Sequence, residues 1–318
     1  MSMEKTCPVC ERDLTAVETS VSQIEQEDAI REAFVNERLG HRPAALEAMD
    51  LTKFMHGGPG RLLGCADCGT LLRDEAEQAN YQEDAYDPVL MRHLYPRYLR
   101  SFELKKLQYQ PLLRPGAEIL EVGSHFGAFL QAAEEWGARP LGLDIGASTS
   151  SFARRQGASV KRLSLEDYSP RSRSPEAIFI WNCFEQLDNP SETLLRSYRL
   201  LDRHGLLIVR VPNADFYRQQ QRRLASRRSK LALQLLGYNN LLGFPYLHGY
   251  TYSGLQRLLR RHCFDPLSIY KSSLLTPPYP DLSPQFQREW RRTRRQGESS
   301  PMSYGPWIEV VCRRRNSD

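Results

Sequence analysis

Short apolar runs alternate with helical patterns over the second half of the chain. The runs predict strands at Ala117 to Gly123, Arg139 to Ile145, Val160 to Leu165, Ala177 to Cys183, Leu206 to Val211, Leu267 to Ser272 and Trp307 to Cys312. Helices are predicted between them at Ala128 to Trp136, Ser148 to Gln156, Pro190 to Asp202 and Ser253 to His262. Apolar strands that alternate with helices indicate a parallel sheet covered on both faces. We therefore expect an α/β fold, a Rossmann-like, mostly parallel sheet of seven strands with flanking helices.

The first part of the chain lacks this alternation. A rough apolar stripe predicts a helix from Ser22 to Leu39, and the glycines between Gly57 and Gly60 interrupt regular structure. Residues 80–110 are expected to form helices that lead into the α/β domain. We therefore expect three parts: a small module at 1–78, a helical lead-in at 79–115 and the main domain at 116–318. A long connection at 213–252 is expected to act as a lid.

The composition is that of a soluble globular protein, with 318 residues, 41% of them hydrophobic and 25% charged. No apolar run approaches the roughly 18 residues of a membrane helix. No apolar segment follows the first residues, which predicts a chain without a secretory signal and a cytoplasmic location. In that reducing compartment the seven cysteines are expected to stay free of disulfides.

Four of the cysteines form two C-x-x-C pairs, Cys7 with Cys10 and Cys65 with Cys68. Four thiolates suit a tetrahedral zinc ion, and Gly69 after the second pair permits a tight turn. The gap between the pairs is longer than usual, although an inserted segment costs little closure entropy. We therefore predict a structural zinc site in the N-terminal module. A redox pair or unliganded thiols remain the alternatives.

The net charge of +5 is unevenly spread. Six basic residues and no acidic residue lie between Tyr217 and Leu231, and five arginines lie between Arg288 and Arg295. Such clusters could bind an anionic substrate, a phosphate or a nucleic acid, or they could be solvated helix faces.

The first predicted strand runs into a glycine-containing turn. Gly123 lets the backbone approach a ligand closely, and Asp144 after the next strand could accept hydrogen bonds from ribose hydroxyls. A dinucleotide site requires glycine at the place of His125, where an imidazole obstructs a pyrophosphate. Glu121 suits a ligand with an ammonium group. The turn therefore favours S-adenosylmethionine over a nicotinamide dinucleotide, and a turn without a ligand is the remaining alternative.

The span from Gly116 to Cys263 resembles the class I S-adenosylmethionine-dependent methyltransferases, in the branch of ubiquinone-type O-methyltransferases and sugar-tailoring enzymes. Glu121 to Gly127 (EVGSHFG) is similar to the first family motif, and Ala177 to Pro190 (AIFIWNCFEQLDNP) to the fourth-strand motif. The resemblance implies S-adenosylmethionine as cofactor. It implies a cofactor site at Glu121, Gly123, Ser124, His125, Phe126, Gly127, Asp144, Ile145, Leu165, Glu166, Asn182 and Cys183.

Two departures from the family pattern bear on the site, the first on cofactor binding and the second on catalysis. His125 replaces the middle glycine of the first motif, and Gln186 replaces a frequent histidine of the fourth-strand motif. Glutamine cannot take a proton at neutral pH. The candidate catalytic residues that remain are His248, Glu185, Tyr250 and His125.

We therefore expect methyl transfer to a small-molecule acceptor, such as a glycoside or a nucleotide-linked metabolite. Arg218, Arg222 and Arg223 could pair with an anionic group of that acceptor. One alternative is nucleic-acid methylation, although no N/D-P-P-(Y/F) tetrapeptide follows the fourth strand. The other alternative is a binding module that keeps the cofactor fold without catalysis.

Overall fold

The computed structural model describes residues 6–16, 62–73, 87–103, 105–170, 174–224, 247–272 and 305–316, with Ala232 and Leu236. The expected helix at Ser22 to Leu39, the glycines at 57–60 and the arginines at 288–295 lie outside the described residues. Most of the connection at 225–246 also lies outside them.

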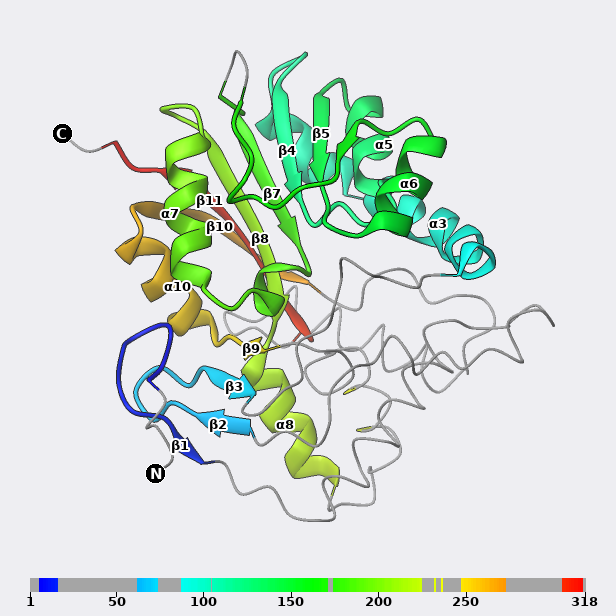
Figure 1. The fold of residues 1–318 in the computed structure, drawn as a ribbon. Helices are drawn as coiled ribbons and strands as arrows, with labels where there is room; N and C mark the ends of the chain where they lie inside the picture. The colour runs from blue at the N-terminus through cyan, green and yellow to red at the C-terminus, as the bar shows by residue number, and fades with distance from the viewer. Residues whose placement is uncertain are drawn as a thin grey trace.

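The predicted sheet of seven strands is confirmed, in the order β10-β11-β8-β7-β4-β5-β6 (Figure 1). Strands β6, β5, β4, β7 and β8 are parallel, and β11 runs antiparallel to both β8 and β10. Their bounds are β4 (Glu118–Val122), β5 (Arg139–Leu143), β6 (Val160–Lys161), β7 (Ala177–Trp181), β8 (Leu206–Pro212), β10 (Phe264–Ser272) and β11 (Trp307–Arg314).

The strand order reverses at β4, which has β5 on one side and β7 on the other. Ligands of open α/β sheets bind outside the carboxyl ends of the strands at such a switch point. The edge strand β6 is shorter than expected, because beyond Lys161 the chain forms a turn in which Asp167 donates its N–H to Ser164 Oγ at 3.2 Å. The topology therefore places the site at the ends of β4, β5 and β7.

Helices cover both faces of the sheet. One face packs against α4 (Lys106–Tyr109), α5 (Ala128–Glu135) and α6 (Ala147–Arg155). A 3₁₀ turn at Gln110–Leu112 follows α4. The other face packs against α7 (Pro190–Leu200) and α10 (Tyr252–Arg261). Two further helices in the described ranges are α3 (Pro88–Glu103), packed on α5, and α8 (Ala214–Leu224), after β8. A second 3₁₀ turn, η4, spans Phe184–Gln186.

Helix α10 shows how the sequence specifies such a layer. Leu255, Leu258 and Leu259 are buried against the sheet, while arginines occupy the opposite face. This spacing gives one apolar stripe at helical period. The side chain of Thr251 caps the helix by accepting the N–H of Gly254 at 3.0 Å. The helix therefore begins one residue earlier than its apolar pattern predicts.

The lead-in is tied to the sheet by a buried ionic cluster. Glu309 of β11 accepts hydrogen bonds from Lys105 Nζ at 2.5 and 2.8 Å and from the Tyr109 hydroxyl at 2.6 Å. Arg210 of β8 lies 3.7 Å from the same carboxylate. Burial alone would raise the pKa of Glu309, but Lys105 and Arg210 bring it below its usual value. Breaking such a buried pair is costly, so the cluster fixes where the lead-in meets the sheet.

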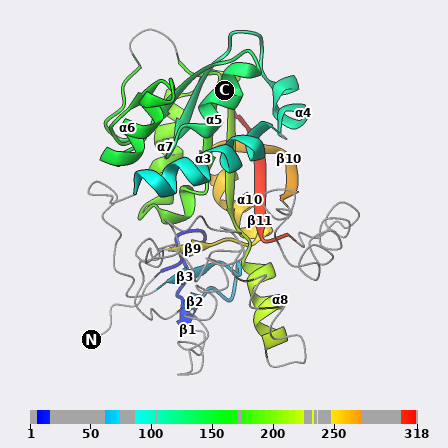
Figure 2. The same ribbon diagram turned by 90° about the vertical axis from the view of Figure 1, so that its right-hand side faces the viewer.

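A second, four-stranded sheet lies beyond the carboxyl ends of β7 and β8 (Figures 1 and 2). Its order is β1-β2-β3-β9, with all pairs antiparallel. The bounds are β1 (Thr15–Ala16), β2 (Leu62–Gly64), β3 (Leu71–Arg73) and β9 (His248–Gly249). Strand β9 comes from the connection between β8 and α10, so the main domain completes the sheet of the N-terminal module.

No helix in the described part of the chain is long and apolar enough to span a membrane. The division at 1–78, 79–115 and 116–318 and the cytoplasmic location stay predictions.

Candidate active site and metal centre

The turn after β4 is specified by two glycines with left-handed backbone. Gly123 has φ +71, and a Cβ there would lie 2.7 Å from Cys183 Sγ. Gly127 has φ +76, and its Cβ would lie 2.9 Å from the Cβ atoms of Ala153 and Ala158. Only glycine meets both demands, so the turn brings the loop after β7 and helix α6 close to β4.

His125 also has a left-handed backbone, with φ +49. This explains why glycine suits the middle of the motif, because a side chain at positive φ is strained. The His125 ring stacks on Phe126, with centroids 3.6 Å apart, and lies edge-on to Tyr98 of α3 at 5.8 Å. The imidazole is thus packed into an aromatic cluster.

Asp144, at the end of β5, is held by its neighbours. Its Oδ2 accepts the N–H of His125 at 2.7 Å, while Oδ1 accepts the N–H of Gly146 at 2.9 Å and the Thr149 hydroxyl at 2.7 Å. These donors come from the turn after β4 and from the start of α6. They fix the carboxylate beside the turn after β4.

Glu121 is buried at the end of β4, and its Oε2 has no hydrogen-bond partner among the described residues. Burial, and then the charge of Asp144, raises its pKa well above the usual value. A buried acceptor without a partner costs free energy until a donor reaches it. An ammonium group would supply that donor.

The other predicted cofactor residues differ in exposure. Ser124, Phe126 and Leu165 are buried, Ile145 is half-buried, and Glu166 is exposed. Ser124 and Phe126 belong to the turn after β4. Ile145 follows β5, and Leu165 and Glu166 follow β6. Glu166 therefore lies at the surface end of the predicted site.

The loop after β7 crosses the turn after β4. Asn182 has a left-handed backbone with φ +51, and Gln186 donates its side-chain N–H to the Asn182 carbonyl at 2.6 Å. Burial raises the pKa of the Cys183 thiol, so this thiol stays protonated. Gln186 thus supports the shape of the loop at the position where the family often has histidine.

Three candidate catalytic residues come together from distant segments. Glu185, His248 and Tyr250 are all buried. Leu247 donates its N–H to the Glu185 carbonyl at 2.9 Å, and Tyr250 donates its N–H to the Pro212 carbonyl at 3.1 Å. The connection after α8 therefore returns to the ends of β7 and β8.

These three side chains keep polar atoms unpaired within the described chain. Both carboxyl oxygens of Glu185, Nδ1 of His248 and the Tyr250 hydroxyl have no partner there. Burial raises the pKa of Glu185 to about 8 and lowers that of His248 to about 4. At neutral pH, Glu185 is therefore mostly protonated and His248 is neutral.

Two of the three arginines expected to bind an anion have partners within the protein. Arg218 donates to the Gly69 carbonyl at 2.6 Å, and Arg223 donates to Gln220 Oε1 at 3.2 Å. Arg222 is exposed on α8. Arg218 therefore connects α8 to the N-terminal module.

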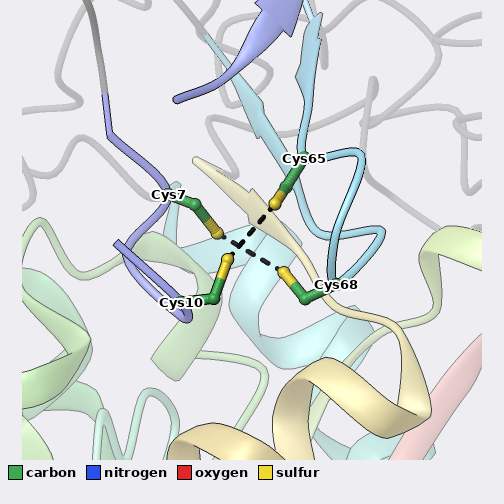
Figure 3. A group of neighbouring side chains, drawn as sticks. All are labelled: Cys7, Cys10, Cys65 and Cys68. Atoms are coloured by element: carbon green, nitrogen blue, oxygen red, sulfur yellow. Dashed lines mark hydrogen bonds between the residues drawn. The ribbon is translucent and has the colours of Figure 1, made fainter. Parts of the chain in front are cut away.

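The sulfur atoms of the four paired cysteines point toward one another (Figure 3). Cys7 Sγ lies 3.4 Å from Cys68 Sγ, Cys10 Sγ lies 3.3 Å from Cys65 Sγ, and all four lie within 4.8 Å of one another. These separations exceed a disulfide bond of about 2.05 Å. Zn–S bonds of about 2.3 Å in a tetrahedron place sulfurs at comparable separations. The donor set and its geometry therefore fit a zinc ion.

Each cysteine pair sits in the same kind of turn. Glu11 donates its N–H to the Cys7 carbonyl, and Gly69 donates to the Cys65 carbonyl, both at 2.9 Å. Glu11 and Gly69 both have left-handed backbone, with φ 61 and 71. The two turns are therefore equivalent, and only the second has glycine where the backbone favours it.

Helix α10 holds both of these turns. Arg261 donates to the Val9 carbonyl at 3.2 Å and pairs with Glu11 at 2.7 Å. Arg257 pairs with Asp67, between the cysteines of the second pair. The cluster therefore packs directly on the main domain.

Two contributors to the site were missed by sequence reasoning. Thr149 fixes Asp144, and Thr251 caps α10 while donating to the Cys68 carbonyl at 2.5 Å. Threonine before a helix is a recognised capping signal, so Thr251 could have been found. No comparable local signal marks Thr149.

A protein-family model described as a methyltransferase domain matches residues 81–266. This match covers more than half of the chain, and the chain belongs to that family. The sheet, the turn after β4 and the family match define an S-adenosylmethionine-dependent methyltransferase. No curated protein matches the chain.

Solved structures are similar to this chain at low sequence identity. A chain of the complex between the Haloferax volcanii Trm112 methyltransferase activator and a methyltransferase is 15% identical, with 72% of this chain and 95% of that chain covered and a TM-score of 0.51. An S-adenosylmethionine-dependent methyltransferase from Thermotoga maritima is 15% identical, covering 72% and 96%, with a TM-score of 0.47. The plantazolicin methyltransferase BamL is 16% identical, covering 93% and 100%, with a TM-score of 0.45.

Proposed function

We propose that this methyltransferase acts on a hydroxyl group of a small molecule, bound between the ends of β7 and β8 and the small sheet. The observation that carries the proposal is the group of buried, unpaired polar atoms on Glu185, His248 and Tyr250. Each such atom costs about 1–3 kcal/mol when it stays unpaired. A polar acceptor that paired with them would remove this cost, which supports a ligand site there.

Glu121 and Asp144 are proposed to hold the cofactor. The unpaired oxygen of Glu121 suits the ammonium of the methionine part, and the fixed carboxylate of Asp144 suits the ribose hydroxyls. S-adenosylmethionine would supply a methyl group bound to a positively charged sulfur. Because Gly123 has no side chain, Cys183 from the loop after β7 can pack directly against the turn beside this part of the site.

His248 is proposed as the general base. Its ring makes a hydrogen bond to the backbone of Glu185, while Nδ1 has no partner in the described part of the chain. A carbonyl can only accept, so Nε2 carries the proton and Nδ1 presents a lone pair. The acceptor oxygen would form its bond to the methyl carbon as the sulfur–carbon bond breaks, and its proton would pass to Nδ1.

Glu185 and Tyr250 are proposed to orient the acceptor. With a pKa of about 8, the Glu185 carboxyl group carries a proton that it can donate at neutral pH. The Tyr250 hydroxyl can donate as well, because burial raises its pKa well above the usual value. Both donors suit an acceptor with several oxygens, such as a glycoside.

Cys7, Cys10, Cys65 and Cys68 are proposed to hold one structural zinc ion. The hydrogen bond between Cys7 and Cys68 lowers the pKa of the Cys68 thiol, which favours the thiolate form that binds a metal ion. Four protein thiolates leave no open position on the ion, which suits a structural role.

The test is methyl transfer from radiolabelled S-adenosylmethionine to a small-molecule metabolite extract and, separately, to RNA. The matched variants are His248→Gln, which loses the base, and Glu185→Gln, which keeps a donor. Loss of a general base lowers the rate about 100-fold or more. We expect label in the extract, that loss for His248→Gln and a change of only a few-fold for Glu185→Gln. Label in RNA, or equal rates for His248→Gln and the parent, would refute the proposal.

A further inference from the structure

Thr251 links the candidate acceptor residues to the four-cysteine cluster. Its hydroxyl donates to the Cys68 carbonyl at 2.5 Å and accepts the N–H of Gly254 at 3.0 Å. The side chain is 4% exposed. Thr251 follows Tyr250 directly, so one buried hydroxyl connects the start of α10, the second cysteine turn and the acceptor side of the site.

The backbone beside Thr251 bridges the two sheets. His248 of β9 pairs with Leu72 of β3, and Arg73 donates its N–H to the Leu247 carbonyl at 2.8 Å. Leu247 in turn donates to the Glu185 carbonyl at 2.9 Å. A continuous series of hydrogen bonds therefore runs from the strand after the second cysteine turn to both His248 and Glu185.

The contact between Thr251 and the cysteine turn is tightly packed. A Cβ on Gly69 would lie 2.7 Å from Thr251 Cγ2, and a Cβ on Gly254 would lie 2.9 Å from Thr70 Oγ1 and 3.2 Å from the Cys68 carbonyl oxygen. Glycine at both positions is what allows this approach. A contact this close transmits a shift of the cysteine turn to Thr251, because packed interiors deform little.

The cofactor side is supported differently. The donors to Asp144 come from His125, Gly146 and Thr149, which belong to the turn after β4 and to the start of α6. These segments are parts of the main domain. A change in the small sheet is therefore expected to leave them in place.

We propose that Thr251 is a positioning residue through which the metal-bearing turn fixes His248 and Tyr250. Metal occupancy then sets the acceptor side of the active site and leaves the cofactor side unchanged. The inference rests on the proposed function, because it assigns His248 and Tyr250 to the acceptor. It adds that the N-terminal module positions the residues that bind the acceptor.

The test compares Thr251→Val, which keeps the shape but loses the hydroxyl, with the conservative variant Thr251→Ser. Arg257→Gln is the matched control, since it removes another contact between α10 and the second cysteine turn, the exposed pair with Asp67. Amide hydrogen exchange of Leu247 and Tyr250 reports on the backbone. The imidazole N–H resonance of ¹⁵N-labelled His248, assigned with His248→Gln, reports on its bond to Glu185. The amide of Gly254 is not used as a reporter, because Thr251→Val removes the hydroxyl that accepts its hydrogen bond.

For Thr251→Val we expect amide exchange at Leu247 and Tyr250 to be about tenfold faster or more, as for local opening. The His248 imidazole signal should weaken, while zinc content and S-adenosylhomocysteine affinity stay within about twofold of the parent. Thr251→Ser and Arg257→Gln should match the parent. Removing zinc from the parent with a chelator should reproduce the Thr251→Val result.

Parent-like exchange and imidazole signal in Thr251→Val would overturn the inference, as would unchanged exchange after zinc removal. A parallel loss of S-adenosylhomocysteine affinity would also overturn it, because the module would then serve the cofactor side. These outcomes are separable from failure of the proposed function. If the parent bound no S-adenosylhomocysteine, the function would fail, while exchange and imidazole signals would still report on Thr251.

Discussion

The proposed cofactor half of the site, at the ends of β4 and β5, differs from the proposed acceptor half, at the ends of β7 and β8, in how its polar groups are satisfied. Asp144 accepts three hydrogen bonds from nearby segments. Glu185, His248 and Tyr250 keep buried polar atoms that find no partner in the described ranges. The Asp144 carboxylate is thus held in place by the chain itself, although Glu121 Oε2 on that side lacks a partner among the described residues, whereas all three acceptor residues keep unpaired atoms.

The two halves also differ in assembly. The cofactor half comes from consecutive strand–turn–helix units, whose hydrogen bonds are local in sequence. The acceptor half joins the loop after β7 to β9, and β9 to a strand of the N-terminal module. A half built from distant segments is expected to lose order first when one of those segments is disturbed.

The largest expected effect tests the turn of the cofactor half. Gly123→Ala places a Cβ 2.7 Å from Cys183 Sγ at φ +71. Overpacking and left-handed strain together should destabilise the fold by about 3 kcal/mol and lower S-adenosylhomocysteine affinity about 100-fold. Urea unfolding and calorimetry measure both. Gly157→Ala, at φ +91 in open space, should cost only about 1 kcal/mol and leave the affinity unchanged. Equal effects of the two substitutions would contradict this account of the turn.

The next effect tests the unpaired carboxyl group of the acceptor half. Glu185 has a folded-state pKa of about 8, above its unfolded value of about 4.3. Between these values the folded protein holds a proton that the unfolded chain releases, so stability falls as pH rises through this window. The loss should be about 2 kcal/mol between pH 6 and 8, and Glu185→Gln should lack that part of the slope.

Urea unfolding of the parent and of Glu185→Gln at a series of pH values measures the difference. The comparison cancels other titrating groups, which both proteins share. Parallel pH profiles would show that Glu185 is ionised in the folded protein, against the proposed role as a donor.

A smaller effect concerns how firmly Asp144 is held. Thr149→Val removes the hydroxyl that donates to Asp144 Oδ1 at 2.7 Å. A hydrogen bond to a charged group contributes about 1.5–3 kcal/mol, so stability should fall by about that much and S-adenosylhomocysteine should bind several-fold more weakly. Ser164→Ala is the control, because its hydroxyl serves an exposed turn. If Thr149→Val bound the ligand like the parent, Asp144 would not depend on this support.

The smallest effect compares the two cysteine turns. Glu11 has φ 61 where the second turn has Gly69, so Glu11→Gly should relieve about 1 kcal/mol of backbone strain. Loss of the surface pair with Arg261 offsets part of this gain. We expect a net stabilisation of about 0.5 kcal/mol, read from the thermal midpoint of the metal-loaded protein. Clear destabilisation would mean that the Arg261 pair anchors the module.

The sequence predicted those parts of the molecule whose signals are local. All seven strands of the main sheet were predicted. The central strands were the clearest, because buried parallel strands read as continuous apolar runs. The sequence also predicted that the two cysteine pairs lie together, because the C-x-x-C spacing is typical of metal ligands. Strand β6 was predicted too long, since the chain leaves the sheet after Lys161 and forms a turn at Ser164.

The residues of the proposed acceptor half could be listed from the sequence, but their arrangement in space could not be predicted. Glu185, His248 and Tyr250 were candidates, yet the pairing of β9 with β3 joins residues far apart in the chain and has no local signature. The position of Asp144 was predicted, whereas its support by Thr149 was not. The packing of the His125 ring on Phe126 and Tyr98 depends on α3, which no motif places there.

Calorimetric titration of S-adenosylhomocysteine into the parent and Asp144→Ala tests the central claim most directly. The account predicts micromolar binding by the parent, with a loss of about 100-fold in the variant when the ribose hydroxyls lose their charged acceptor. Circular dichroism and zinc content should match between the two proteins. Absence of binding by a folded, zinc-loaded parent would contradict the cofactor site, and equal binding by both proteins would contradict the role of Asp144.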